Sequence, residues 1–279
     1  MIELKNLTKK FGDFCAVDHL NLKVETGEFL GLLGANGAGK TTTISMISTV
    51  LLPTEGEIII DGEKLDRRAS DIKRKLSVIT QEYSMRQDMT LEEVMEYQGR
   101  LYRMKKKDIK EKTEELFEFA DLLEHRRKTV RHLSGGMKRK LMVCRGLMTD
   151  PEIMLLDEPT AGMDAISRRQ MWNLLRRLNE RNITIILTTH YIEEAQSLCE
   201  RIALIDKGKL DVVGPPQDLI DELGKYAVDV IEEEDVVSRY FNDRDQAIEY
   251  LTGINGNTVM RDTSLEDVFI ERNGKRISG

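Results

Sequence analysis

One glycine-rich run in this sequence carries residue types that bind phosphate. The eight residues from Gly34 to Thr41, GANGAGKT, match the pattern G-x-x-x-x-G-K-[ST] at every fixed position. Such glycines let backbone N–H groups turn toward an anion, while Lys40 would bridge the β- and γ-phosphates and Thr41 would bind Mg²⁺. The apolar run Phe29–Leu33 precedes it and a helix is expected from about Gly39. This order of strand, loop and helix predicts a nucleoside triphosphate site, whereas a chance glycine-rich turn would not require it.

Two carboxylates form a second candidate site. Asp157 and Glu158 follow an apolar run, Ile153–Leu156, which is expected to be a central strand. Ligands of α/β proteins bind at the carboxyl ends of such strands. Asp157 would hold Mg²⁺, directly or through water, and Glu158 would polarise the attacking water. A strand that merely ends in acidic turn residues is the alternative, but the lysine 117 residues upstream (157 − 40) favours the functional interpretation.

A third candidate is the segment LSGGM, which runs from Leu133 to Met137. Ser134 is a good N-cap for a helix that continues to Leu147. A capped helix after a turn needs no ligand, yet its exposed N–H groups and dipole could bind a second phosphate. Because one protomer has a single γ-phosphate position and the glycine-rich run already fills it, this helix end suggests a nucleotide brought by another copy.

The composition limits the kind of protein. The 279 residues and 32.0 kDa suffice for one large and one small domain, and the net charge of −7 argues against nucleic-acid binding. The three cysteines are far apart and without a C-x-x-C pair, which favours a reducing compartment. The start of the chain does not read as a signal peptide, and no stretch reaches the roughly 20 apolar residues that span a bilayer. These features predict a cytosolic chain whose membrane role would depend on a partner.

The expected elements give an α/β fold with two additions. Alternating strands at 2–7 and 20–24 predict an antiparallel region before the glycine-rich run, and the helix at 42–50 follows it. Residues 89–149 have helical spacing, with a capping signature at Thr90, and form a helical insertion. A strand at 183–188 and a hairpin at 202–213 complete the core. Beyond a boundary at Gly214, strands at 226–231 and 258–260 alternate with helices at 245–251 and 264–271.

Taken together, these stretches resemble the ATP-binding subunits of ABC transporters. The matching motifs are GANGAGKTT, LSGGMKRK, IMLLDEPT followed by AGMD, and His190, which occur in the family's order within residues 1–213. The resemblance implies a P-loop NTPase fold, with a RecA-like core, an antiparallel β subdomain and a helical subdomain at about 89–149. Residues 214–279 would form a small C-terminal α/β accessory domain.

The resemblance also implies roles for individual residues. Phe11 would stack on adenine, although a strand-edge aromatic is the alternative, and His190 would hydrogen-bond the γ-phosphate and orient Glu158. ATP would be held by Phe11, Val17, Gly34, Asn36, Gly37, Ala38, Gly39, Lys40, Thr41 and Thr42, and from the second copy by Ser134, Gly135, Gly136 and Asp164. Catalysis would use Lys40, Gln81, Glu158 and His190, and Mg²⁺ would be bound by Thr41, Gln81 and Asp157. Gln81 would also link to a membrane subunit.

The implied activity is ATP hydrolysis by a subunit that dimerises around ATP, with a homodimer expected. It would power transport through separate integral membrane permease subunits, from a cytoplasmic position on the inner face of the cell membrane. LSGGMKRKL, the tail and the segment SLEDVF at 264–269 resemble the exporter-type subfamily for drugs, sodium or polysaccharide-like substrates.

Two rival classes remain. A soluble ABC-type ATPase acting on DNA or the ribosome is disfavoured by the single P-loop and the short interval of 53 residues between Gln81 and Ser134 (134 − 81). A non-catalytic nucleotide-binding regulator is disfavoured by the intact set Lys40, Asp157, Glu158 and His190.

Overall fold

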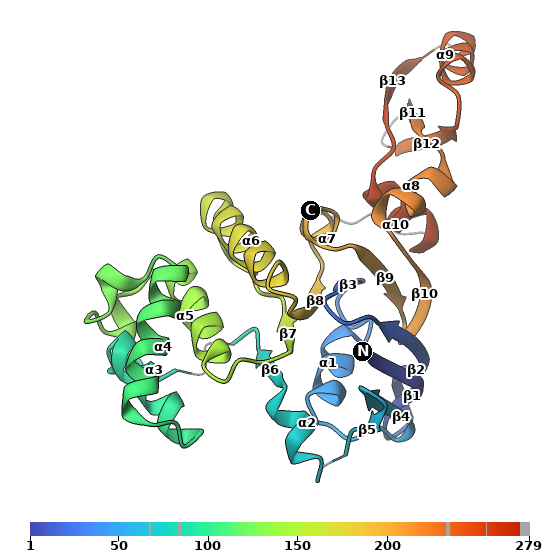
Figure 1. Cartoon of the computed structure of the whole chain (residues 1–279). Coiled ribbons are helices and arrows are strands. Elements are labelled where there is room, and N and C mark those ends of the chain that lie inside the picture. The colour runs from blue at the N-terminus through green and yellow to red at the C-terminus, as the bar shows by residue number, and fades with distance from the viewer. Residues whose placement is uncertain (67, 83–84, 233–234, 255, 274–279) are drawn as a thin grey trace.

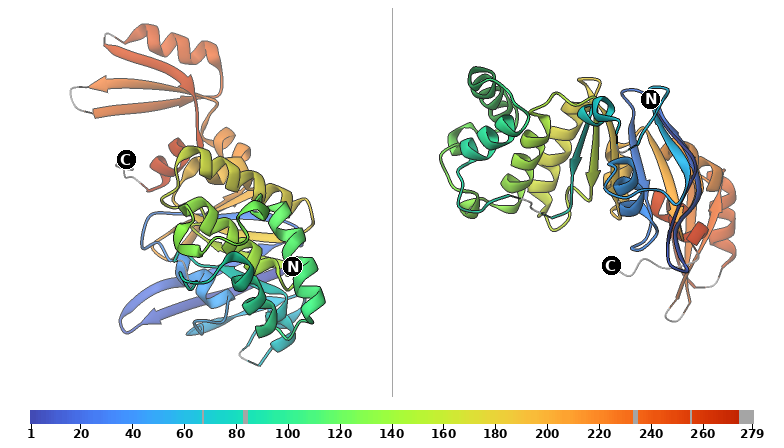
Figure 2. Two further views of the ribbon diagram at one scale, coloured as in Figure 1. Left: turned by 90° about the vertical axis from the view of Figure 1, so that its left-hand side faces the viewer. Right: turned by 90° about the horizontal axis from the view of Figure 1, so that it is seen from below.

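The structure is a computed structural model that describes residues 1–66, 68–82, 85–232, 235–254 and 256–273. Figure 1 shows a central α/β core, a helical block on one side of it and a C-terminal unit that projects away from it. In the view from below in Figure 2, the helical block and the N-terminal sheet lie on opposite sides of the core.

A six-stranded sheet forms the core, in the order β10-β9-β3-β8-β7-β6. The neighbours from β9 to β6 are parallel, and β10 is antiparallel to β9. Every residue of β3, β7 and β8 is buried, as expected for apolar strands covered on both faces. Their carboxyl ends therefore meet at one edge. The strands are β3 (Phe29–Leu33), β6 (Leu76–Ile79), β7 (Ile153–Asp157), β8 (Thr184–Thr189), β9 (Arg201–Asp206) and β10 (Lys209–Gly214).

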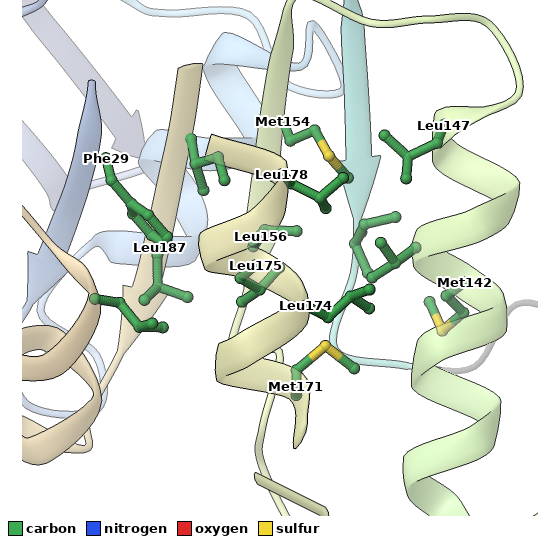
Figure 3. Close-up of a cluster of buried hydrophobic side chains, with 14 of the residues drawn as sticks. Phe29, Met142, Leu147, Met154, Leu156, Met171, Leu174, Leu175, Leu178 and Leu187 are labelled. Atoms are coloured by element: carbon green, nitrogen blue, oxygen red, sulfur yellow. The ribbon is translucent and has the colours of Figure 1, made fainter. Parts of the chain in front are cut away.

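Alternate residues of these strands supply two separate cores. On one face, Met154, Leu156 and Leu187 pack against α6 (Ala165–Asn179), whose apolar residues recur at helical spacing (Figure 3). Met142 and Leu147 of α5 (Gly135–Leu147) belong to the same cluster, so the helical block is joined to the core through α5. The face also carries α7 (Ile192–Leu198).

The opposite face of the sheet packs on α1 (Lys40–Ile47) and on an N-terminal antiparallel sheet. This sheet has the order β2-β1-β4-β5, and Leu155 and Ile186 of the core share a cluster with its inner side chains. Its strands are β1 (Ile2–Phe11), β2 (Phe14–Val24), β4 (Glu55–Ile60) and β5 (Glu63–Lys64), and the short helix α2 (Ser70–Arg74) follows. The turn between β1 and β2 carries Phe11 and Phe14, which are both exposed.

The helical block consists of α3 (Leu91–Leu101), α4 (Lys106–Phe119), two 3₁₀ turns at Leu123–His125 and Val130–His132, and α5. The expected cap of its first helix is confirmed. Thr90 accepts a hydrogen bond from the Glu93 backbone N–H, and the Glu93 carboxylate accepts one from that of Thr90.

The C-terminal unit places a three-stranded antiparallel sheet, in the order β12-β11-β13, beside helices. Its elements are α8 (Pro216–Leu223), β11 (Tyr226–Glu232), β12 (Asp235–Phe241), α9 (Arg244–Gly253), β13 (Asn257–Asp262) and α10 (Leu265–Asn273). Neither α8 nor β12 was predicted from the sequence. The predicted helix at 42–50 is also too long, because α1 ends at Ile47 and Thr49 has a left-handed φ of 61°.

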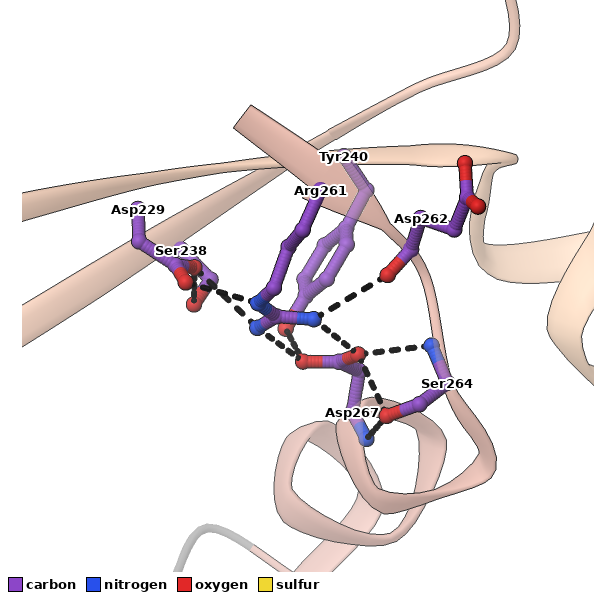
Figure 4. Close-up of polar contacts among 7 residues, drawn as sticks. All are labelled: Asp229, Ser238, Tyr240, Arg261, Asp262, Ser264 and Asp267. Carbon is purple, nitrogen blue, oxygen red and sulfur yellow. Dashed lines mark hydrogen bonds and ion pairs between the residues drawn. The ribbon is translucent and has the colours of Figure 1, made fainter. Parts of the chain in front are cut away.

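One arginine connects this sheet to the last helix (Figure 4). The Arg261 guanidinium donates to both carboxylate oxygens of Asp267 and to those of Asp229, with four N–O distances of 2.7 to 3.1 Å. Asp267 also accepts from the backbone N–H and the hydroxyl of Ser264. Since α10 packs on α8 and α7, this cluster fixes the sheet to the core. Across the described ranges, no helix is both long and apolar enough to span a membrane.

Candidate active site

The carboxyl ends of β3, β7 and β8 open on a cavity of about 560 Å³. Most of the side chains that the sequence assigned to nucleotide and catalysis within one chain lie on its wall. The lining residues are Phe11, Phe14, Ala16, Asn36, Gly37, Gly39, Lys40, Thr41, Thr42, Gln81, Glu158, Ala161 and His190.

The glycine-rich loop is shaped by backbone crowding. A Cβ at Gly34 would lie 2.3 Å from the Ile205 carbonyl oxygen, and one at Gly39, where φ is 105°, would lie 2.5 Å from that of Ala16. No other residue type fits these positions, and the resulting turn leads into the N-terminus of α1, as an anion cradle requires.

Three of the residues predicted to bind the nucleotide, Val17, Gly34 and Ala38, are not among the described residues that line the cavity, and their assignment stays a prediction. Val17 is only 1% exposed and packs under Gly39, while Gly34 and Ala38 are absent from the cavity lining among the described residues. Ala38 accepts a backbone hydrogen bond from Gly208 at 2.9 Å. Their packing supports the loop, and Ala16, which is itself only 5% exposed, lines the cavity next to Val17.

Lys40 reaches back into its own loop. It is 5% exposed, and its Nζ donates to the carbonyl oxygens of Gly34 and Ala35 at 2.9 and 3.1 Å. Burial lowers the pKa of this amine, while the nearby carboxylates Glu158 and Asp157 act in the opposite direction. The ammonium is thus held at the centre of the cradle, where phosphate oxygens could replace the two carbonyls.

A cluster of oxygen atoms lies beside it. The Thr41 hydroxyl donates to Asp157 Oδ1 at 3.1 Å, and the Thr188 hydroxyl donates to the same atom at 2.5 Å. A hydroxyl and a carboxylate are the hard oxygen donors that Mg²⁺ prefers, and a site with few protein ligands suits an ion that keeps waters and phosphate oxygens. The residues therefore fit Mg²⁺. Gln81 lies on the wall of the same cavity.

Glu158 and His190 form a hydrogen-bonded pair, with Nδ1 and Oε1 3.0 Å apart. Glu158 has a left-handed φ of 46°, which costs a non-glycine residue roughly 1–3 kcal/mol and requires firm support. Its backbone N–H donates to the Thr188 carbonyl at 3.0 Å, and its own carbonyl accepts from Arg139 at 3.0 Å. A carboxylate held in this way can accept a proton from water.

The residues assigned to the second copy form a separate group at two helix N-termini. The Ser134 hydroxyl caps α5 by accepting from Met137 N–H, and Asp164 caps α6 by accepting from the Ser167 N–H and hydroxyl. These bonds from Ser167 lower the pKa of Asp164. Gly136 faces Ser167, since a Cβ there would lie 3.1 Å from its hydroxyl. Within the described part of the chain, none of Ser134, Gly135, Gly136 and Asp164 lines the Lys40 cavity.

Some residues of the site were missed. Phe14 could have been found, because it pairs with Phe11 across the β1–β2 turn. Thr188 and Arg139 carried no recognisable signal, since a β-branched residue in a strand and a basic residue in a helix are common.

Comparison of the sequence with known protein families and proteins shows the family to which this chain belongs. The family described as ABC transporter matches residues 17–161. The chain belongs to this family. It is 36% identical to the Nod factor export ATP-binding protein I of Cupriavidus metallidurans, over 95% of this chain and 85% of that protein. It is 35% identical to the linearmycin resistance ATP-binding protein LnrL of Bacillus subtilis, over 80% and 72% of the two chains.

Comparison with solved structures supports the same family and fold. The dimeric post-hydrolysis ATP-binding cassette MJ0796, bound to ADP and Pi, is 30% identical, with a TM-score of 0.69 over 77% of this chain and 98% of that one. The cbiO1 structure from Clostridium perfringens supports the fold alone, at 22% identity and a TM-score of 0.74 over 79% and 90%. The predictions of a P-loop NTPase fold and of an exporter-type ABC ATP-binding subunit are confirmed. The chain binds ATP, and it is an ATPase that powers transport.

Proposed function

We propose that two copies of this chain close around ATP and Mg²⁺ and drive export through separate membrane subunits. One observation carries this proposal. In a single chain, the Lys40 cavity and the capped helix ends at Ser134 and Asp164 are separate sites. The loop at Lys40 and the helix N-terminus at Ser134 are both suited to bind phosphate, and Asp164 would contact the phosphate-binding loop of the second copy. A dimer in which each copy covers the other's cavity would use both. The dimeric cassette bound to ADP and Pi supports this arrangement.

The residues then divide the chemistry. Lys40 and the loop N–H groups would bind the phosphates, and Thr41 and Asp157 would hold Mg²⁺, with Gln81 close by. Bound Mg²⁺ supplies neutralisation of phosphate charge. Glu158, oriented by His190, would take the proton of the attacking water, a contribution of roughly 10²- to 10⁴-fold. Phe11 would stack on the base, and Phe14 lies beside it on the cavity wall. The second copy would supply Ser134, Gly135, Gly136 and Asp164 and exclude bulk water.

The partners follow from the relatives. Proteins named for Nod factor export and linearmycin resistance are ATP-binding subunits, which supports integral membrane permease subunits as partners and export as the direction. We place the dimer on the cytoplasmic face of the membrane, with Gln81 near the permease. We further propose residues 1–213 as the ATPase domain, with its helical subdomain at about 89–149, and 214–279 as an accessory domain.

Glu158→Gln tests the site and the dimer together. The variant should hydrolyse ATP roughly 10²- to 10⁴-fold more slowly and elute as a dimer in gel filtration with ATP and Mg²⁺, because bound ATP persists. Glu118→Gln, an exposed change on α4, is the matched control and should behave as the unmodified chain. A Glu158→Gln variant that stays monomeric and hydrolyses ATP normally would contradict both assignments. Co-purification of a polytopic membrane protein would support the permease partner.

A further inference from the structure

Arg139 is a buried cation in the first half of α5. It is 1% exposed and is among the largest fully buried side chains of the described residues. Its Nη1 donates to the Thr80 carbonyl at 2.5 Å, and its Nη2 donates to the Glu158 carbonyl at 3.0 Å. The planar guanidinium can serve two acceptors at once because its donors form a rigid fork.

The two carbonyls belong to loops that matter for the reaction. Thr80 directly precedes Gln81, and Glu158 is the candidate base. The loops leave the adjacent parallel strands β6 and β7, where Ile79 pairs with Leu156. Arg139 therefore joins the Gln81 loop and the Glu158 loop at the edge of the sheet where the cavity opens.

The same helix also carries the proposed contact with the second copy. Ser134 caps α5 only five residues before Arg139 (139 − 134), and the residues between them are helical. The Lys138 N–H donates to the Ser134 carbonyl at 2.9 Å, and such bonds between residues four apart make a helix move largely as one element over one or two turns. A displacement of the Ser134 end must therefore reach the guanidinium, and through it the two carbonyls.

Glu158 is a residue whose backbone depends on such support. Its left-handed φ is unfavourable for a non-glycine residue. Its N–H donates to the Thr188 carbonyl, and its C=O accepts from Arg139 at 3.0 Å and from the Ala161 N–H at 3.2 Å. Loss of the guanidinium would leave this carbonyl with the longer bond from Ala161 alone, so that the peptide could relax and shift the carboxylate away from His190.

We propose, on the basis of the dimer proposed above, that Arg139 is a positioning residue that couples α5 to Gln81 and Glu158. When the second copy's nucleotide engages the Ser134 end of α5, the guanidinium sets both loops in the geometry for hydrolysis. The nucleotide bound by one copy thus controls the base of the other copy.

Two variants of Arg139 test the coupling. Arg139→Met keeps the apolar stem and removes both donors, and Arg139→Lys keeps the charge but cannot serve two carbonyls in the same way. In each, kcat for ATP hydrolysis should fall, by roughly 10- to 100-fold in Arg139→Met, because small displacements of a catalytic group are costly. The nucleotide Kd should stay within about twofold, since the Lys40 loop is untouched. Arg139→Lys should recover only part of kcat.

Lys140→Gln is the matched control, because Lys140 is a neighbouring buried cation of α5 that faces Asp121 instead. It should leave kcat unchanged. The rate is expressed per bound nucleotide, so that a partly unfolded variant does not imitate the effect, and Arg139→Lys guards against a misfolded Arg139→Met. An unchanged kcat in both Arg139 variants, or an equal loss in Lys140→Gln, would overturn the coupling role. If Glu158→Gln dimerises with ATP while the Arg139 variants hydrolyse normally, only this inference fails and the proposed function stands.

Discussion

Glu194, on α7, is a carboxyl group with no contact to solvent. It is 0% exposed, and its Oε1 accepts from the Thr160 hydroxyl at 2.7 Å and from the Trp172 indole at 3.0 Å. Its Oε2 has no hydrogen-bond partner among the described residues. Burial raises the pKa of Glu194, against the opposing effect of its hydrogen bonds. Because Thr160 is two residues from Glu158, this hydrogen bond joins α7 to the segment that carries the candidate base.

The raised pKa of Glu194 gives a prediction about stability and pH. The folded chain retains this proton at a pH where the unfolded chain has lost it. The free energy of unfolding therefore falls as the pH rises from about 4.5 through the raised pKa. In Glu194→Gln this loss should disappear, so the variant should gain relative stability with rising pH. Urea unfolding between about pH 5 and 8 measures it. Glu193→Gln, an exposed neighbour, should run parallel to the unmodified chain, and parallel curves for Glu194→Gln would refute the assignment.

At this scale, the sequence predicted residues whose chemistry is tied to a motif and missed those whose role comes from burial. Lys40 and Glu158 were assigned from the motifs that contain them and His190 from the family resemblance, and all three line one cavity. Thr188, Glu194 and Arg139 act through contacts between residues 22 to 59 positions apart, and local pattern carries no information on such pairs. Val17 was assigned from the family resemblance, and the sequence does not reveal that its buried side chain packs under Gly39.

Among the elements, the C-terminal sheet depends on a single ionic cluster for its attachment to α10. Asp267 is only 4% exposed as a side chain, and Arg261 supplies two of the bonds to its carboxylate. Burial by itself would raise the pKa of Asp267, yet the bonds from Arg261 and Ser264 lower it overall. The carboxylate is thus charged in the folded chain and needs its partner.

Arg261→Met should loosen the C-terminal unit and spare the core. Leaving two carboxylates without their cation should cost the unit roughly 1–3 kcal/mol, a figure reduced because Arg261 is partly exposed. Amide hydrogen exchange in β11 and β13 should accelerate. The fluorescence of Trp172, which is the one tryptophan of the sequence and packs against the core, should report an unchanged unfolding midpoint. Arg239→Met, an exposed arginine of β12, is the control. Unchanged exchange in Arg261→Met would show that the cluster does not hold the sheet.

The elements were predictable where periodicity was strong. The strand at Phe29–Leu33 was predicted to the residue, and the strands at Ile153–Asp157 and Thr184–Thr189 were predicted to within one residue. The misses lie in the C-terminal unit, where α8 has only eight residues and β12 begins next to acidic residues that resemble a solvated turn. Short elements of this kind are stabilised by neighbours rather than by their own pattern.

Over the whole molecule, the Lys40 cavity and the helix ends at Ser134 and Asp164 are separate features, since neither of these two residues is among the described ones that line the cavity. If two copies pair with two-fold symmetry, each composite site takes Lys40 from one copy and Ser134 from the other. A substitution of either residue then damages both sites of a homodimer. When one copy carries the Lys40 substitution and the other carries the Ser134 substitution, one of the two sites stays intact.

Complementation between two inactive variants tests this arrangement. Lys40→Ala removes the phosphate contact, and Ser134→Arg obstructs the helix end, so each homodimer should hydrolyse ATP very slowly. A heterodimer of the two, isolated with different affinity tags, has one site with both defects and one with neither, because the intact Lys40 and the intact Ser134 come from different chains. Its activity should therefore rise clearly above both parents, toward about half that of the unmodified dimer if the sites act independently. A heterodimer of the Lys40→Ala single variant with the double variant has no intact site and is the control. Equal inactivity of the mixed pair and this control would mean that Lys40 and Ser134 do not meet across the dimer.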